Sequence, residues 1–191
     1  MAVARHDTGP LSAGRALASQ VHPVFMLPPL ATSLFGALLA ESVTFSLRVA
    51  ALHAAAMFFA VYTAHVKDGY VDFHVRGEDD DHPMTVGGCR GALVAAGLGF
   101  AACLVGLYLL VGPGAALVTA PTWVIGYTHA PQLDLNPVGA TMGYPGGIAL
   151  ALLGGYYAQA TAFSPRVLGL AGVFLLLLTG IKIIDDEKDF D

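Results

Sequence analysis

Two aspartates, four residues apart, stand at the end of an apolar segment. The segment Val49–Val66 leads into an acidic stretch, 65–82, in which Asp68 and Asp72 would lie one turn apart on the same face of a helix. Two carboxylates at the mouth of a membrane helix are costly to hold unless a cation pairs with them. A divalent ion bound through oxygen ligands would do so, and Mg²⁺ is the usual ion where phosphates are also present. The pair therefore indicates a Mg²⁺ site.

A second acidic stretch, 185–191, repeats this spacing. Asp185 and Asp189 are again four residues apart and again follow an apolar run, with Asp186 beside them. If the two stretches face each other, their carboxylates can hold Mg²⁺ ions that bridge to a diphosphate. Asp68, Asp72, Asp185 and Asp189 would then be the catalytic carboxylates. The candidate metal ligands are Asp68, Asp72, Asp79, Asp185, Asp186 and Asp189.

Basic side chains near the acidic stretches could bind the remaining phosphate oxygens. Arginine is suited to this by its bidentate hydrogen bonds, and the candidates are Lys67, Arg76, Arg90 and Lys188. A substrate with a diphosphate at the membrane surface and an apolar tail among helices is a prenyl diphosphate. Because bound metal ions neutralise charge on a leaving diphosphate, the residues predict ionisation to an allylic cation and then attack by an acceptor.

The composition is that of a membrane protein. Of 191 residues, 55% are hydrophobic and 12% are charged, whereas soluble domains carry about 25% charged residues; the mean hydropathy is +0.66. We expect an all-α integral membrane protein with a cytoplasmic arm at 1–20 and one transmembrane domain at 21–191. Six apolar runs predict its spanning helices: Pro23–Ala40, Val49–Val66, Gly91–Val111, Ala115–Tyr127, Val138–Ala158 and Val167–Ile184.

The basic residues predict the orientation. With six spans, the ends of the second, fourth and sixth lie on the side of the N-terminus. Seven basic residues fall on that side, and only Arg48 and Arg166 fall opposite, so the positive-inside rule makes it cytoplasmic. Both aspartate pairs would then open to the cytoplasm. This inference requires that the short fourth run, Ala115–Tyr127, crosses the membrane.

Cysteine and histidine add little to the sequence interpretation. Cys103 lies in the middle of an apolar run and Cys89 lies near a polar loop, so we expect neither a disulfide nor a zinc site. His65 and His74 are interpreted as polar boundary residues rather than ligands. His53 falls in the middle of a span, and we expect it to form a hydrogen bond between helices.

Both acidic stretches resemble motifs of the UbiA-type intramembrane prenyltransferases. The first family motif, near NDxxDxxxxxxD after helix two, is similar to the run from Asp68 to Asp72 followed by Arg76 and Asp79, with Asp68 where asparagine is usual. The second family motif, DxxxD after helix six, is matched by Asp185 and Asp189. The resemblance covers roughly residues 20–191.

A third segment is similar to one branch of that family. The run Tyr127-Thr128-His129-Ala130-Pro131 resembles the YTGGP region of the 1,4-dihydroxy-2-naphthoate branch, with His129 and Ala130 replacing two glycines. The resemblance implies that Tyr127 and His129 contact the acceptor, although both would also suit anchors at the membrane interface.

The family resemblance also implies a fold and a set of partners. It implies a nine-helix bundle, of which this chain would form about six helices and lack the last three. The implied partners are Mg²⁺, a prenyl diphosphate, membrane lipid, and an acceptor that is either an aromatic quinone precursor or a lipid. We expect no nucleic-acid partner, and the sequence does not predict an oligomeric state.

Two other functions fit part of the pattern. A divalent-cation transporter or channel would explain acidic clusters at helix ends, although transporters usually hold their carboxylates near the membrane midplane. A non-catalytic membrane fragment or subunit would explain the missing helices. Both stay open as alternatives to the prenyltransferase.

Overall fold

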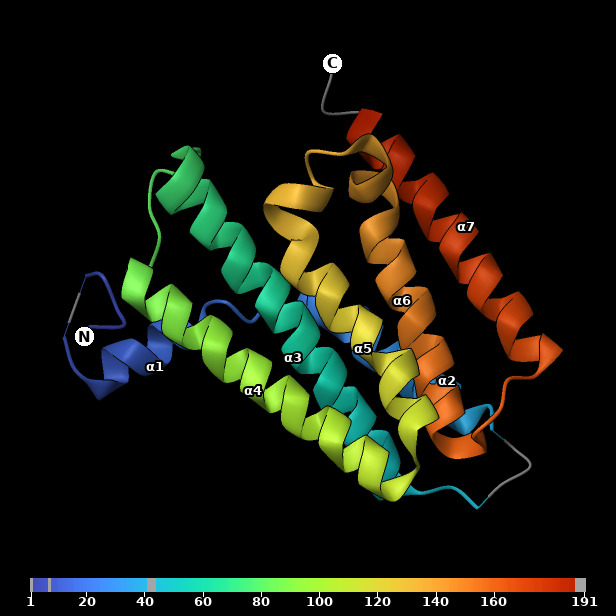
Figure 1. Cartoon of the computed structure of the whole chain (residues 1–191). Helices are drawn as coiled ribbons and strands as arrows, with labels where there is room; N and C mark the ends of the chain where they lie inside the picture. The colour runs from blue at the N-terminus through green and yellow to red at the C-terminus, as the bar shows by residue number, and fades with distance from the viewer. Residues whose placement is uncertain (1, 7, 41–43, 188–191) are drawn as a thin grey trace.

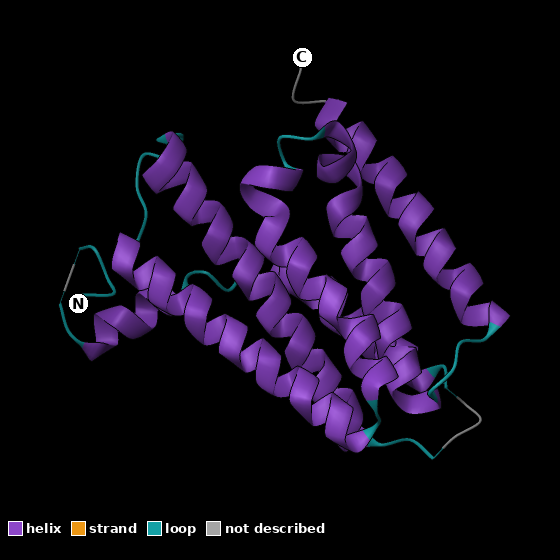
Figure 2. Ribbon diagram, viewed as in Figure 1, coloured by secondary structure: helices purple, strands orange, loops and turns teal. Residues whose placement is uncertain are grey.

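The computed structural model describes residues 2–6, 8–40 and 44–187, without the side chains of residues 186 and 187. Helices make up nearly all of this part of the chain, and loops join them (Figure 2). A single isolated β-bridge joins Ala4 to Met84. The elements in chain order are α1 (Pro10–Ala18), α2 (Pro23–Leu38), α3 (Leu47–Val71), η1 (Asp72–Arg76), α4 (Val86–Leu110), α5 (Pro113–Thr128), η2 (His129–Leu133), α6 (Pro137–Ala160) and α7 (Pro165–Glu187).

Each predicted apolar run corresponds to one of the helices α2 to α7. The helices alternate in direction, so the C-terminal ends of α3, α5 and α7 lie at one end of the bundle (Figure 1). This arrangement follows from short connections, which force neighbouring helices to run antiparallel. The helices that lead into the two acidic stretches, α3 and α7, therefore end at the same end of the bundle, and the predicted membrane side of that end stays a prediction.

Fewer helices than six meet the requirements of a membrane span. Leu47–Arg76, Val86–Leu110 and Pro165–Asp185 are long and apolar enough, and a fourth candidate arises if α1 and α2, bent by 67°, count as one broken span. The helices α2 and α5 have only 16 residues each, which is short of the roughly 20 residues that span a bilayer. The structure is therefore compatible with a membrane protein, and the part of the chain that it describes contains three to four candidate spans.

Close contact between α2 and α6 depends on glycine. A Cβ atom on Gly155 would collide with the backbone carbonyl of Ser33, and one on Gly36 would collide with the carbonyl of Leu152. The two helices therefore pack backbone against backbone, as small residues allow in membrane bundles. Gly155 is therefore needed for this contact, whereas Gly146 of the same helix faces open space.

A buried hydrogen bond joins α2 to α3. His53 is fully buried, and its Nδ1 lies 2.7 Å from Ser33 Oγ. Gly154 of α6 leaves room for the other ring nitrogen, because a Cβ there would collide with His53 Nε2. The predicted interhelical hydrogen bond of His53 is therefore confirmed, and it fixes three helices relative to one another.

The N-terminal arm packs onto the loop that follows η1. The backbone N–H of Arg5 donates to the Pro83 carbonyl at 2.9 Å, and that of Thr85 donates to the Val3 carbonyl at 2.9 Å. Ala16 of α1 is buried in a cluster with Val66 and Met84. The arm therefore lies on the surface, where many of its residues are exposed, and backbone pairing and an apolar contact hold it there.

Replacement of Gly155 tests the contact between α2 and α6. We expect Gly155→Ala to lower the free energy of unfolding by about 2 kcal/mol, because the added methyl group forces the two backbones apart. Gly146→Ala is the matched control in the same helix and should leave stability unchanged or raise it slightly. Thermal unfolding in detergent measures both, and equal midpoints for the two variants would contradict the close approach.

Candidate functional site

A π-helical turn extends α3 at its acidic end. Asp72 and Arg76 bound this turn, η1. It ends at Gly77, whose φ of +67° is a left-handed conformation that glycine adopts without strain. The backbone N–H of Glu78 then donates to the Asp72 carbonyl at 2.9 Å. Such turns occur often at functional sites because they redirect side chains from the helical path.

Arg76 is the cation that pairs with the acids around this turn. Its Nη1 lies 2.8 Å from Asp134 Oδ2, 3.3 Å from Asp72 Oδ1 and 3.8 Å from Glu78 Oε2. The side chains of Arg76, Asp72 and Asp134 are each about three-quarters buried. The positive charge that the acidic pair requires is therefore supplied in part by the protein itself.

Asp68 lies one turn before this ion-pair network. Its side chain is half-buried, and it forms no hydrogen bond or ion pair with any residue that the structure describes. The charges of His129, Asp134, Arg76 and Asp79 act on its carboxylate. Asp68 is therefore a carboxylate with free oxygen atoms beside a network of opposite and like charges.

Two further polar atoms of the network have no protein partner. Arg76 Nη2 and Asp134 Oδ1 are buried, and neither has a hydrogen-bond partner among the described atoms. A buried polar group without a partner costs about 1–3 kcal/mol. The site thus presents unpaired carboxylate oxygens next to an unpaired guanidinium N–H.

Asp134 is the residue that the sequence interpretation missed. It follows η2, where the backbone contains a cis peptide bond between Ala130 and Pro131, and its N–H donates to the His129 carbonyl at 3.0 Å. The signal in the sequence that could have identified Asp134 is its position along the chain. Asp134 is an acid in the loop after the fourth apolar run, on the same predicted side as both acidic stretches.

Lys67 connects the site to an apolar groove between α4 and α5. Its Nζ donates to the Tyr127 carbonyl at 3.4 Å and lies 4.2 Å from the centroid of the Tyr127 ring. Tyr127 lines the groove, whose volume is about 800 Å³, and stacks on Trp123. The other lining side chains include Leu93, Val94, Phe100 and Leu104, and Arg90 also borders the groove.

The structure brings together many of the predicted residues of the first acidic stretch. Asp68, Asp72 and Arg76 gather at the end of α3 with Asp79, and Lys67 contacts Tyr127 nearby. The charge of His129 acts on Asp68. Arg90 is exposed on α4 and borders the same groove as Tyr127.

Most of the second acidic stretch lies outside the described residues. Lys188 and Asp189 are not described, and nothing is known of the Asp186 side chain. Asp185 is exposed in the last turn of α7, and the C-terminal ends of α7 and α3 lie at the same end of the bundle (Figure 1). That the two aspartate pairs face each other stays a prediction.

Comparison with known proteins assigns no family. No protein-family model matches the chain, and neither the curated proteins nor the solved structures contain a match. The resemblance to UbiA-type prenyltransferases therefore rests on the motif residues alone.

A double-mutant cycle tests the ion-pair network. We expect Arg76→Gln and Asp134→Asn to be strongly coupled in thermal unfolding, because each leaves the other side chain buried with fewer partners. The exposed pair of Arg5 and Asp81, 3.3 Å apart, provides the control cycle, and its coupling should be much smaller. Equal coupling in the two cycles would contradict a special role for Arg76.

Proposed function

We propose that the end of α3 binds a Mg²⁺–diphosphate group and that the chain transfers the attached prenyl group to an acceptor within the membrane. The proposal rests on one observation, which is that unpaired hydrogen-bond acceptors and an unpaired hydrogen-bond donor lie side by side at this site. Free oxygens of Asp68 and Asp134 suit a divalent cation, and the free N–H of Arg76 suits a phosphate oxygen. A metal ion alone would leave the arginine donor unpaired.

The residues present fit a magnesium ion. Its usual ligands are carboxylate oxygens together with substrate phosphates, and Asp68, Asp72 and Asp134 provide the carboxylates. Asp72 already pairs with Arg76 through one oxygen. Glu78 and Asp79, both exposed, would add negative charge that attracts the ion. When bound, Mg²⁺ would neutralise charge on the departing diphosphate.

The groove between α4 and α5 supports a substrate with an apolar tail. Its wall is formed by leucine, valine, phenylalanine and tryptophan side chains, and Lys67 contacts Tyr127 at its edge. A diphosphate at Asp68 would therefore have an apolar surface close by for an isoprenoid chain. Lys67 stands between the two, where its ammonium group can donate to a diphosphate oxygen.

The reaction expected of the chain begins with separation of the allylic cation from the diphosphate anion. The bond between the allylic carbon and the diphosphate oxygen breaks, and the diphosphate leaves with the electron pair. Arg76 and Lys67 would hold its oxygens. The stacked rings of Tyr127 and Trp123 would present π-faces, which favour a nearby cation. The acceptor then forms the new bond to the allylic carbon and loses a proton to restore its charge.

The acceptor belongs to the same proposal. An aromatic quinone precursor is the first candidate and a lipid the second, with Tyr127 and His129 as the residues expected to contact it. His129 lies at the start of η2, within electrostatic reach of Asp68.

Ligand-dependent stability tests the diphosphate site. We expect a non-hydrolysable geranylgeranyl diphosphate analogue to raise the thermal midpoint of the purified chain only when Mg²⁺ is present. At a ligand concentration of 100 times Kd the gain is about 2.7 kcal/mol. Asp68→Asn and Asp72→Asn should each abolish this gain, because they remove metal ligands.

Asp80→Asn is the matched control for these variants. Asp80 is exposed in the same acidic stretch, and its replacement should leave the stabilisation intact. Stabilisation without Mg²⁺, or its retention in Asp72→Asn, would contradict the proposal. Mg²⁺-dependent stabilisation that needs no diphosphate would instead favour a cation-transport function.

A further inference from the structure

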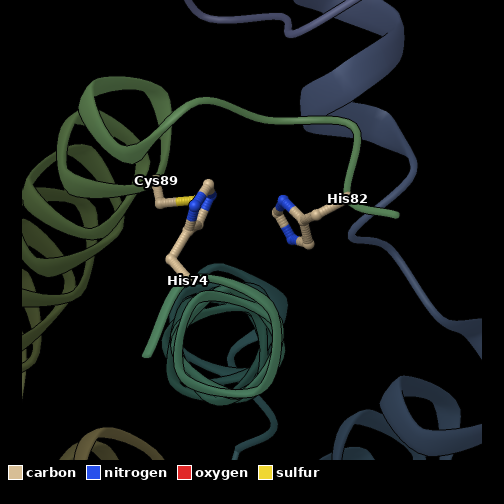
Figure 3. A group of neighbouring side chains, drawn as sticks. All are labelled: His74, His82 and Cys89. Carbon is tan, nitrogen blue, oxygen red and sulfur yellow. The ribbon is translucent and has the colours of Figure 1, made fainter. Parts of the chain in front are cut away.

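A cluster of two histidines and one cysteine lies beside the acidic site. His74 comes from η1, His82 from the loop 77–85 and Cys89 from the first turn of α4 (Figure 3). One ring nitrogen of each histidine and the Cys89 sulfur all lie within 4.8 Å of one another. His82 and Cys89 are buried, with exposures of 4% and 0%, and His74 is half-buried.

We propose that His74, His82 and Cys89 bind a zinc ion. Two imidazoles and a thiolate are typical ligands of Zn²⁺, whereas Mg²⁺ prefers oxygen. In a tetrahedral site with bonds of about 2.0–2.3 Å, ligand atoms are about 3.3–3.8 Å apart. The three side chains therefore need to close by about 1 Å to bind the ion. The Cys89 thiol loses its proton on binding, and a water molecule can complete the tetrahedron at the half-buried His74 side.

The ring nitrogen His82 Nε2 points independently to a ligand. It is buried and has no hydrogen-bond partner among the described atoms. A buried imidazole nitrogen without a partner is costly, and a metal ion is one way to satisfy it. A Cβ atom on Gly69 would lie 2.7 Å from this nitrogen, so glycine at this position makes room for the His82 ring.

One nitrogen of each ring lies against the backbone of Met84. His74 Nε2 donates to the Met84 carbonyl at 3.1 Å, which leaves His74 Nδ1 with a free lone pair. His82 Nδ1 lies 3.2 Å from the same carbonyl and 3.1 Å from the Met84 N–H. Metal-binding histidines usually have their second nitrogen fixed in this way by a carbonyl or carboxylate.

The zinc ion would connect three segments that the chain brings together only here. His74 lies two residues from both Asp72 and Arg76, and Met84 pairs with Ala4 of the N-terminal arm. Arg5 of the arm covers the ring of Phe73 at 4.4 Å. Bound zinc would therefore tie η1 to α4 under the arm and fix the turn that carries the ion-pair network.

Zinc stoichiometry and a cobalt spectrum test the proposal on the full chain in detergent. After removal of metal with a chelator, dialysis against zinc at micromolar concentration should leave one Zn²⁺ per chain. Cys89→Ser, which keeps the size of the side chain, and His82→Asn should each weaken zinc binding at least tenfold. Cobalt in place of zinc should give a thiolate-to-metal charge-transfer absorption that excess zinc removes.

Matched control variants distinguish a loss of zinc ligands from a general effect of substitution elsewhere in the chain. Cys103→Ser alters the other free, buried cysteine of α4 and should retain the zinc, as should Asp68→Asn in the proposed Mg²⁺ site. Failure of the wild-type chain to bind zinc would overturn the proposal. So would full zinc binding by Cys89→Ser. If that variant does not fold, the wild-type cobalt spectrum decides, because a spectrum without the thiolate band excludes Cys89 as a ligand.

Discussion

Arg76 is the charge on which the acidic end of the bundle depends. Three carboxylates lie within 4 Å of its guanidinium group, from Asp72, Glu78 and Asp134. Without a cation, the half-buried acids at the end of an apolar helix would repel one another and lose their hydration. The π-helical turn holds Arg76 beside Asp72, and the left-handed Gly77 turns the chain so that the Glu78 N–H donates to the Asp72 carbonyl. Backbone geometry and electrostatics thus support the same arrangement.

The network is only partly satisfied, and this distinguishes it from a purely structural ion pair. A structural network gains most when every donor and acceptor is paired. Here Arg76 Nη2, Asp134 Oδ1 and the Asp68 carboxylate are left unpaired among the described residues. Binding of a cation together with an anion would offset the cost of these unpaired groups. A metal diphosphate supplies both. The proposed zinc site lies on the adjacent side of η1, so one short turn would serve two different metals.

The sequence was sufficient to predict the helices and the grouping of Asp68, Asp72 and Arg76 at the end of α3. Long apolar runs separated by glycine, proline and charged residues locate α2 to α7, because helix length and hydropathy are local properties. The spacing of Asp68 and Asp72 is equally local. Asp134 and the grouping of His74, His82 and Cys89 depend on how distant segments fold onto one another. The two cysteines by themselves predict no zinc site, because the proposed site takes two of its three ligands from histidine.

Manganese in place of magnesium gives the most direct test of the central claim, that the acids at the end of α3 hold a metal diphosphate. Mn²⁺ is paramagnetic and prefers the same oxygen ligands, so electron paramagnetic resonance can count the bound ions. Electron–nuclear double resonance can then detect phosphorus beside them. With inorganic diphosphate present, the account predicts bound Mn²⁺ that is coupled to phosphorus in the wild-type chain and is lost in Asp68→Asn. Bound Mn²⁺ without phosphorus coupling, or unchanged binding in Asp68→Asn, would contradict it.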